Sequence, residues 1–303
     1  MQKKKTLLRQ LKDQKWSLLF IAPVVLLFVV FVLGPLIASF YWSFTDYNGI
    51  HSPRWVGLDN YKNIFTNDPR FWKAISNTIF YTVGVIPAGV VISLLLALAI
   101  DQKIKFKKFF GMMYFIPAVT SVIALSVVWK WMFAGEKYGL INHFLILMGF
   151  KPIDWLMSTT WTLPAIMVMS IWAGIGYNMI IFLAGLYTIP ATVYEAADID
   201  GCNEIQKFFY ITLPLVKPII FFMAVTGIIG ALNAFTEIYA MTKGGPILTL
   251  FDKSLGATKL TGYYLFTKWE QSEYGYAAAM SYALLILTIV ISKVQEKFLH
   301  AED

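Results

Sequence analysis

Long stretches without a charged residue constrain this chain more than any other feature. Thirty uncharged residues lie between Lys15 and Asp46, and 27 lie between Lys73 and Asp101. A helix needs about 20 mostly apolar residues to cross the hydrocarbon core of a bilayer, which is roughly 30 Å thick. Each of these stretches is therefore long enough to cross a membrane once.

Counting all such stretches predicts six crossings. The 40 uncharged residues between Asp154 and Glu195 suffice for one helix and a lead-in, but not for two helices and a turn. Only the fifth stretch contains a carboxylate, Glu237. We therefore expect an all-α polytopic membrane protein, with residues 1–303 forming a single transmembrane domain. The expected spans cover residues 16–44, 74–100, 108–132, 163–186, 218–242 and 274–293.

Composition agrees with this reading and excludes several classes of protein. The chain is 58% hydrophobic and 14% charged, whereas soluble domains are about 45 to 50% apolar and about 25% charged. One cysteine cannot form an internal disulfide, and three scattered histidines lack metal-ligand spacing. The spans contain no catalytic set, so we expect no enzyme, no catalytic residue and no metal site.

Basic residues indicate the orientation, since Lys and Arg concentrate in cytoplasmic loops. We read the net charge of +7 in this way and expect no nucleic-acid partner. A cleaved signal peptide is the alternative for the N-terminus. We expect a retained anchor, because the apolar run is too long for a signal peptide and lacks an A-x-A-like site. Six spans then place both termini in the cytoplasm. The two basic clusters are Lys3, Lys4, Lys5, Arg9, Lys12 and Lys15, and Lys103, Lys105, Lys107 and Lys108.

The first outer loop, residues 46–73, is rich in aromatic side chains. Trp55, Tyr61, Phe65 and Trp72 stand among polar residues there. Such a pattern is typical of short interfacial helices. Anchoring in the lipid and contact with an external partner both remain open for these side chains.

The loop after the fourth span, residues 190–215, carries signals for two short helices. Thr192 with Glu195 predicts a capping box that starts the first helix, and Gly201 predicts its end. A partner could approach the small residues while the acids select its charge. A solvated or interfacial connecting helix is the alternative. The expected docking face consists of Glu195, Ala196, Ala197, Asp198, Asp200 and Gly201.

The second helix of this loop has its own start and stop signals. Asn203 with Gln206 predicts another capping box. Pro214 predicts the end of the helix, because proline lacks the backbone N–H and clashes with the preceding turn.

These loop residues also carry a family resemblance. Glu195-Ala-Ala, three residues, Gly201, nine residues, Ile211, one residue and Leu213-Pro214 match every fixed position of the EAA signature. That signature is found in permease subunits of binding-protein-dependent ABC importers. Other segments resemble the carbohydrate-importing branch, similar to the larger permease of the maltose transporter and to sugar-phosphate permeases. They are residues 44–47, 55–61, 244–246 and 275–279. The outer loop 247–273 is longer than this resemblance leads us to expect, and its role stays open.

The resemblance implies an assembly, because the chain lacks the G-x-x-x-x-G-K-[ST] loop that grips ATP. It implies a type I permease fold and alternating access in a bacterial cell membrane, with the EAA loop docked on an ATPase. The chain itself would bind no cofactor, since ATP and Mg belong to the ATPase subunits. The implied partners are a second homologous permease, two ABC ATPases, an extracellular solute-binding protein, the lipid bilayer and a sugar.

Substrate contacts should lie near the bilayer midplane on polar or interrupted helices. Glycines could open a concave wall and aromatic rings could stack on a sugar, although packing between helices uses the same residue types. In the fourth span we single out Ser170, Trp172, Gly174, Gly176, Tyr177 and Asn178, and in the fifth Asn233 and Glu237. By resemblance, Ser170, Gly174, Tyr177 and Asn233 align with sugar-facing positions.

Glu237 bears on both the site and the rival functions. A carboxylate within a span costs about 2.5 to 3.5 kcal/mol, so it should face a cavity or a partner helix. An ion-coupled secondary transporter would need several such groups. A permease for an anionic cargo such as glycerol-3-phosphate would need basic groups along its path, and Lys130 is better explained by snorkelling. We expect a neutral sugar or oligosaccharide of unspecified identity and length.

Overall fold

The computed structural model describes residues 15–102, 105–250 and 253–300. The chain separates into two compact units, residues 1–64 with 268–283 and residues 65–267 with 284–303. Most of the basic cluster before the first span, and Lys103, lie outside the described residues. The single transmembrane domain stays a prediction.

The first unit contains one continuous apolar helix. Its segments are α2 (Lys15–Phe28), a π-helical turn η1 (Val29–Leu33) and α3 (Gly34–Trp42). Residues 19–42 are long and apolar enough to cross a membrane, and their most apolar window is entirely unburied. The first expected span, residues 16–44, is therefore one helix with a single wide turn.

Three segments that the sequence singles out meet in this unit. An isolated bridge pairs Thr45 with Trp55, and the rings of Phe44 and Trp55 stack with centroids 5.3 Å apart. The Asn60 Nδ2 atom donates to the carbonyls of Ser43 and Thr45. Gly275, at the start of the third segment, lies very close to the first segment, because a Cβ there would lie 2.1 Å from the Thr45 carbonyl oxygen.

Short helices are expected in the first outer loop, and the structure forms one before residue 69. It is α4 (Asp59–Thr66), while residues 46–58 have no helix. The last helix, α15 (Tyr274–His300), begins at the predicted residue and runs seven residues past the expected end at 293.

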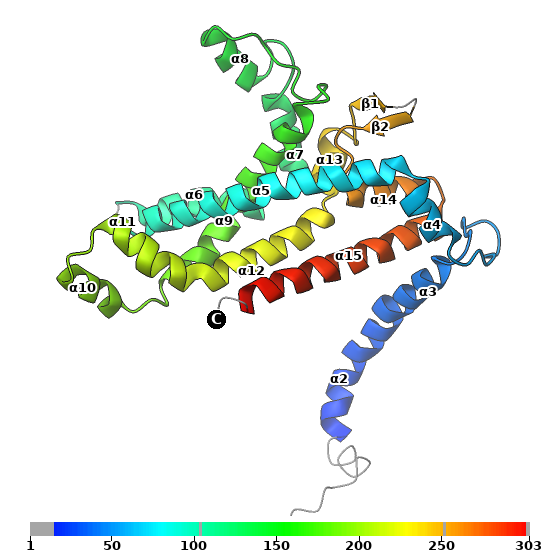
Figure 1. The fold of residues 1–303 in the computed structure, drawn as a ribbon, viewed down its shortest axis with the longest axis horizontal. Helices are drawn as coiled ribbons and strands as arrows, with labels where there is room; N and C mark the ends of the chain where they lie inside the picture. The colour runs from blue at the N-terminus through cyan, green and yellow to red at the C-terminus, as the bar shows by residue number, and fades with distance from the viewer. Residues whose placement is uncertain (1–14, 103–104, 251–252, 301–303) are drawn as a thin grey trace, which may run out of the picture. The chain divides into compact units, whose positions relative to one another are not determined.

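The second unit is a bundle built around a 33-residue helix, α5 (Pro69–Asp101). It packs against α9 (Thr162–Leu186) and α12 (Leu213–Leu232), and α6 (Lys107–Val119) packs against α9 (Figure 1). Helix α5 starts five residues before the prediction, because the Asp68 carboxylate caps it by accepting from the backbone N–H groups of Arg70 and Phe71.

The third expected span, residues 108–132, is wrong as a straight helix. Helix α6 ends at Val119 and α7 (Val122–Met132) continues at an angle of 100°. Thr120 and Ser121 between them have extended backbone, with ψ of 142° and 128°. Two extended residues end the helical hydrogen bonding, yet neither carries a charge that a search for uncharged stretches would notice. Within the described residues, five helices qualify as spans, or six if this bent pair counts as one.

The fifth expected span, residues 218–242, is wrong at both ends. It begins with α11 (Glu204–Lys207) and a π-helical turn η2 (Phe208–Thr212), which run without a break into α12. It ends at Leu232, and a separate short helix, α13 (Thr236–Met241), follows a three-residue break.

Pro214 does not end the second helix of the loop, contrary to the prediction. The Leu213 N–H donates to the Phe208 carbonyl, five residues back, as a π-turn requires. Pro214 occupies the first turn of α12, where its missing N–H is tolerated. The helix therefore continues through the π-turn η2 and beyond Pro214.

The last outer loop adds a short β-hairpin to a fold that is otherwise helical in its described residues. Strands β1 (Ile247–Leu250) and β2 (Lys253–Gly256) form an antiparallel hairpin, followed by α14 (Thr261–Glu270). Asp252, within the long loop 247–273, lies outside the described residues. The hairpin is tied to α5, because Asn77 Nδ2 donates to the carbonyls of Gly256 and Lys259.

Candidate functional site

The first short helix of the 190–215 loop is α10 (Ala191–Ile199). Its N-cap is Pro190, whose extended ψ of 135° sets the helix boundary, and no side chain caps the first turn. The capping box predicted from Thr192 and Glu195 is therefore wrong, because Thr192 already lies inside the helix.

The end of α10 agrees with the prediction for Gly201. Its φ is +76°, a conformation in which a Cβ is unfavourable. The Gly201 N–H donates to the Asp198 carbonyl, and the Cys202 N–H donates to the Ala197 carbonyl. These two bonds form a Schellman cap. The predicted second capping box, between Asn203 and Gln206, is also formed.

The predicted docking face of α10 is mostly accessible. Glu195, Ala196, Asp198 and Asp200 are exposed, whereas Ala197 is buried and so does not belong to the accessible face. The Asp198 carboxylate is 2.5 Å from the Lys207 Nζ atom, so its charge is already paired within the chain.

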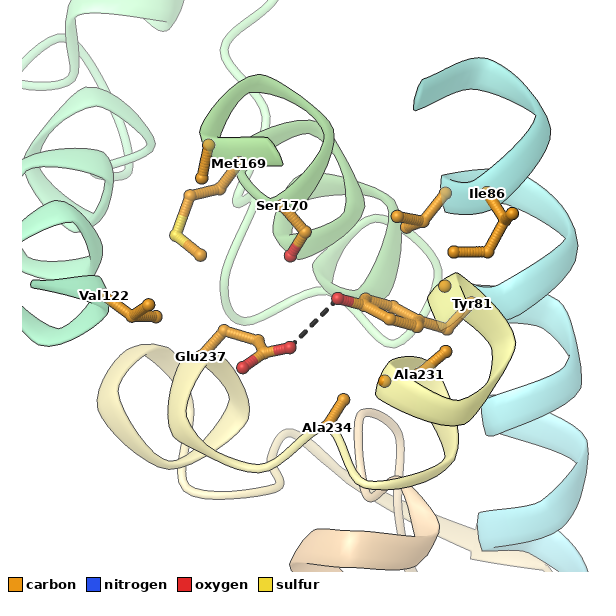
Figure 2. A pocket seen from close by; sticks show the side chains of 12 residues that line it. Tyr81, Ile86, Val122, Met169, Ser170, Ala231, Ala234 and Glu237 are labelled. Atoms are coloured by element: carbon orange, nitrogen blue, oxygen red, sulfur yellow. Dashed lines mark hydrogen bonds between the residues drawn. The ribbon is translucent and has the colours of Figure 1, made fainter. Parts of the chain in front are cut away.

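A cavity of about 250 Å³ is lined by residues of α5, α7, α9, α12 and α13 in the second unit. Figure 2 shows Ser170 from α9, Tyr81 from α5 and Glu237 from α13 around it. The Tyr81 hydroxyl donates to Glu237 Oε1 at 3.0 Å. The Ser170 Oγ atom is buried and has no hydrogen-bond partner in the described part of the chain. The cavity therefore presents a hydroxyl and a carboxylate that could bind a polar molecule.

A second cavity of about 310 Å³ adjoins the first, since Ser170 and Gly227 line both. Gly174, Tyr177 and Asn178 of α9 line it. Neither cavity has a Lys, Arg or His among its described lining residues. Of the eight candidates singled out in the sequence, five line these two adjoining cavities: Ser170, Gly174, Tyr177, Asn178 and Glu237.

The remaining sequence candidates lie elsewhere. Asn233 is the C-cap of α12, and its Nδ2 atom donates to the Ile229 carbonyl instead of facing either cavity. Trp172 packs edge-on against Trp129, with ring centroids 5.6 Å apart. Gly176 packs α9 against α6, because a Cβ there would lie 2.0 Å from the Tyr114 carbonyl oxygen.

Glu237 and Tyr81 show what sequence reasoning missed. Glu237 occupies the first turn of α13, beyond the break, so it is not inside a continuous span as predicted. Tyr81 was not a candidate at all. Its partner is 156 residues away, and no local spacing pattern links the two.

The sequence matches one family model and several known proteins. Residues 63–298 match the family model described as binding-protein-dependent transport system inner membrane component. The arabinooligosaccharides transport system permease protein AraP of Bacillus subtilis is 35% identical over 92% of this chain and 87% of its own. The lactose transport system permease protein LacF of Rhizobium radiobacter is 34% identical over 91% of each chain.

A solved structure agrees with the fold. A chain of a bacterial ABC transporter that imports the acidic polysaccharide alginate superposes with a TM-score of 0.83, covering 97% of this chain and 98% of that one. The two chains are 21% identical, so the likeness concerns the fold and not the cargo.

Proposed function

Since the chain belongs to the family of binding-protein-dependent ABC transporter permeases, we propose that it carries an uncharged sugar or oligosaccharide across the membrane. It is a multi-pass inner-membrane transport subunit and not an enzyme. The hollow lined by Ser170 and Glu237 is the observation that carries the choice of cargo.

The proposed topology has six spans, with α6 and α7 as one broken crossing, and both termini in the cytoplasm. This is the type I importer arrangement. It puts α10 on the cytoplasmic side and the β1–β2 hairpin outside. The clusters of lysines before the first span and around residue 105 support this orientation.

The proposed assembly contains a second homologous permease, two ABC ATPases that hold ATP and Mg, and an external solute-binding protein. The alginate transporter has been solved with an alginate-bound periplasmic protein, which supports the last partner. ATP binding would close the ATPase pair and move α10. The helices of the permease would then rotate between inward-open and outward-open states.

The cargo follows from the polar groups of the cavity. Sugar hydroxyls can donate to Glu237 and exchange hydrogen bonds with Ser170, while the Tyr177 ring offers a surface for stacking. Relatives named for lactose and arabinooligosaccharides support the same class. A sugar phosphate fits less well, because the described lining has a carboxylate and no basic side chain.

Purification of the tagged protein from native membranes tests the assembly. We expect mass spectrometry to identify a homologous permease and an ABC ATPase, and the purified complex to hydrolyse ATP. Reconstituted vesicles should then accumulate a neutral oligosaccharide in the presence of ATP. A stable homo-oligomer that transports solute without any ATPase would overturn the proposal.

A further inference from the structure

Helix α10 has an unusual attachment to the rest of the second unit. It makes no extensive helix-to-helix contact within the described residues, and Ala197 is its one buried residue. In Figure 1 it lies at one end of the unit, beyond α11 and α12. Apolar packing therefore contributes little to fixing its direction.

Two polar links attach α10 to the start of the following span. The Tyr194 hydroxyl and the Thr212 hydroxyl are 2.9 Å apart and share a hydrogen bond. The Asp198 carboxylate forms an ion pair of 2.5 Å with Lys207 Nζ. Tyr194 and Asp198 are four residues apart and share one face of α10. Their partners stand at the two ends of the π-turn η2, so the links hold that turn at both ends.

Lys207 is the central residue of this arrangement. Its side chain is only 11% exposed, and its Nζ atom also lies 2.8 Å from the Glu204 carboxylate. Two carboxylates thus share one largely buried cation. Removing the cation would break both ion pairs and leave the Tyr194–Thr212 hydrogen bond as the remaining one of the two links.

The far side of the attachment is open. A cavity of about 510 Å³ separates Tyr194 and Lys207 from the end of α5 near Leu98 and Asp101. Among the described residues, this cavity lies between Tyr194 and the end of α5, whereas the two polar links tie α10 to the start of the following span.

We propose that Tyr194 and Lys207 are positioning residues that join α10 to η2 and α12 into one rigid body. A displacement of α10 then moves α12, which lines the cavity, by the same amount. The inference rests on the proposed function, in which an ATPase moves α10, and adds the two residues that transmit the movement.

The first test measures cargo transported per ATP hydrolysed by the complete importer in vesicles. Lys207→Met should lower this ratio about tenfold while basal ATP hydrolysis persists, because α10 moves without η2. Lys207→Arg, which keeps a cation between Asp198 and Glu204, should retain most of the wild-type ratio. Lys105→Met, an exposed lysine of the preceding basic loop, serves as the matched control. A wild-type ratio in Lys207→Met would overturn the proposal.

The second test replaces the Tyr194–Thr212 hydrogen bond by a covalent link. Tyr194→Cys with Thr212→Cys, in a chain that also carries Cys202→Ser, is joined by a short bifunctional thiol reagent. A rigid body tolerates this lock, so the cross-linked importer should keep its ratio. Loss of transport on cross-linking, reversed by cleaving the reagent, would show that the joint must open and would refute the proposal. Gly201→Asp tests the docking function itself, so an effect there without one at Lys207 would reject only the rigid body.

Discussion

The cargo cavity and helix α10 are held in place by opposite means. Tyr81, a cavity residue, is 4% exposed on a long helix packed against two others. Helix α10 is largely exposed and depends on a glycine cap and two polar links. Packing fixes a site through many weak contacts, whereas a few polar links can be broken one at a time. Mutations should therefore change folding or cargo choice at the first region and energy coupling at the second.

The largest effect should come from the packing behind the cavity. Gly176→Ala places a Cβ against the backbone of Tyr114, which cannot move as a flexible side chain can. Overpacking of this kind costs about 1 to 3 kcal/mol or more. We expect a clear fall in the melting temperature and yield of detergent-solubilised protein.

Gly111→Ala on α6 is the matched control, since a Cβ there meets nothing within 4 Å. Equal melting temperatures for the two variants would show that α6 and α9 do not approach as closely as the structure has them.

The next effect concerns the end of α10. Gly201→Asp puts a side chain at φ +76°, a left-handed conformation that costs roughly 1 to 2 kcal/mol. We expect the subunit to insert and assemble normally, while uptake is lost because α10 no longer seats on its partner. Uptake and ATP hydrolysis are measured on the same vesicles. Gly201→Asn should retain more activity, because asparagine tolerates this conformation. Normal transport by Gly201→Asp would contradict the docking role.

A smaller effect should appear in the choice of cargo. Glu237→Gln removes the negative charge but keeps a hydrogen-bonding side chain beside Tyr81. We expect neutral-sugar uptake to need a several-fold higher cargo concentration, since the neutral amide replaces a charged hydrogen bond of about 1.5 to 3 kcal/mol by a neutral one of about 0.5 to 1.5 kcal/mol. Competition by a carboxylate-bearing sugar should become stronger. Asn233→Ala, outside the cavity, is the control, and equal effects of the two variants would argue against a special role for Glu237.

The smallest difference in stability is expected between variants of the two predicted capping boxes. Asn203→Ala removes a formed cap, which is worth about 1 kcal/mol. Thr192→Ala removes a side chain that makes no cap, so its effect should stay within about 0.5 kcal/mol. Thermal unfolding of the two variants compares them directly. A larger loss for Thr192→Ala would restore the capping box that the sequence predicts.

The sequence predicts those features of the fold that are determined by residues close together in the chain. The fourth span is right to within one residue, 163–186 against Thr162–Leu186, because the uncharged stretch between Asp154 and Glu195 has room for only one helix. The breaks at residues 120–121 and 233–235 were missed, since an uncharged break looks like the rest of an uncharged stretch. Local signals also found the Gly201 cap, whose hydrogen bonds join residues of the six-residue segment 197–202.

The cavity shows the same limit more strongly. Ser170, Gly174 and Tyr177 were singled out by residue type and by a family resemblance, and all three line the second cavity. Tyr81 was not found, because its meaning depends on a partner in a distant helix. The sequence suggests the same role for Asn233 and Glu237. Because α12 ends at Leu232, Asn233 instead lies at the C-cap of that helix, whereas Glu237 lines the cavity.

The π-turn η2 has a geometric consequence for the whole subunit. A π-turn holds one more residue than an α-turn, and each residue of an α-helix advances about 100° around the axis. The single additional residue in Phe208–Thr212 therefore sets the azimuth of everything that follows in α12. Its removal would rotate Gly227 and Ala231 away from the cavity that they line by more than a quarter of a turn. One residue of helix length thus decides which face of α12 lines this cavity.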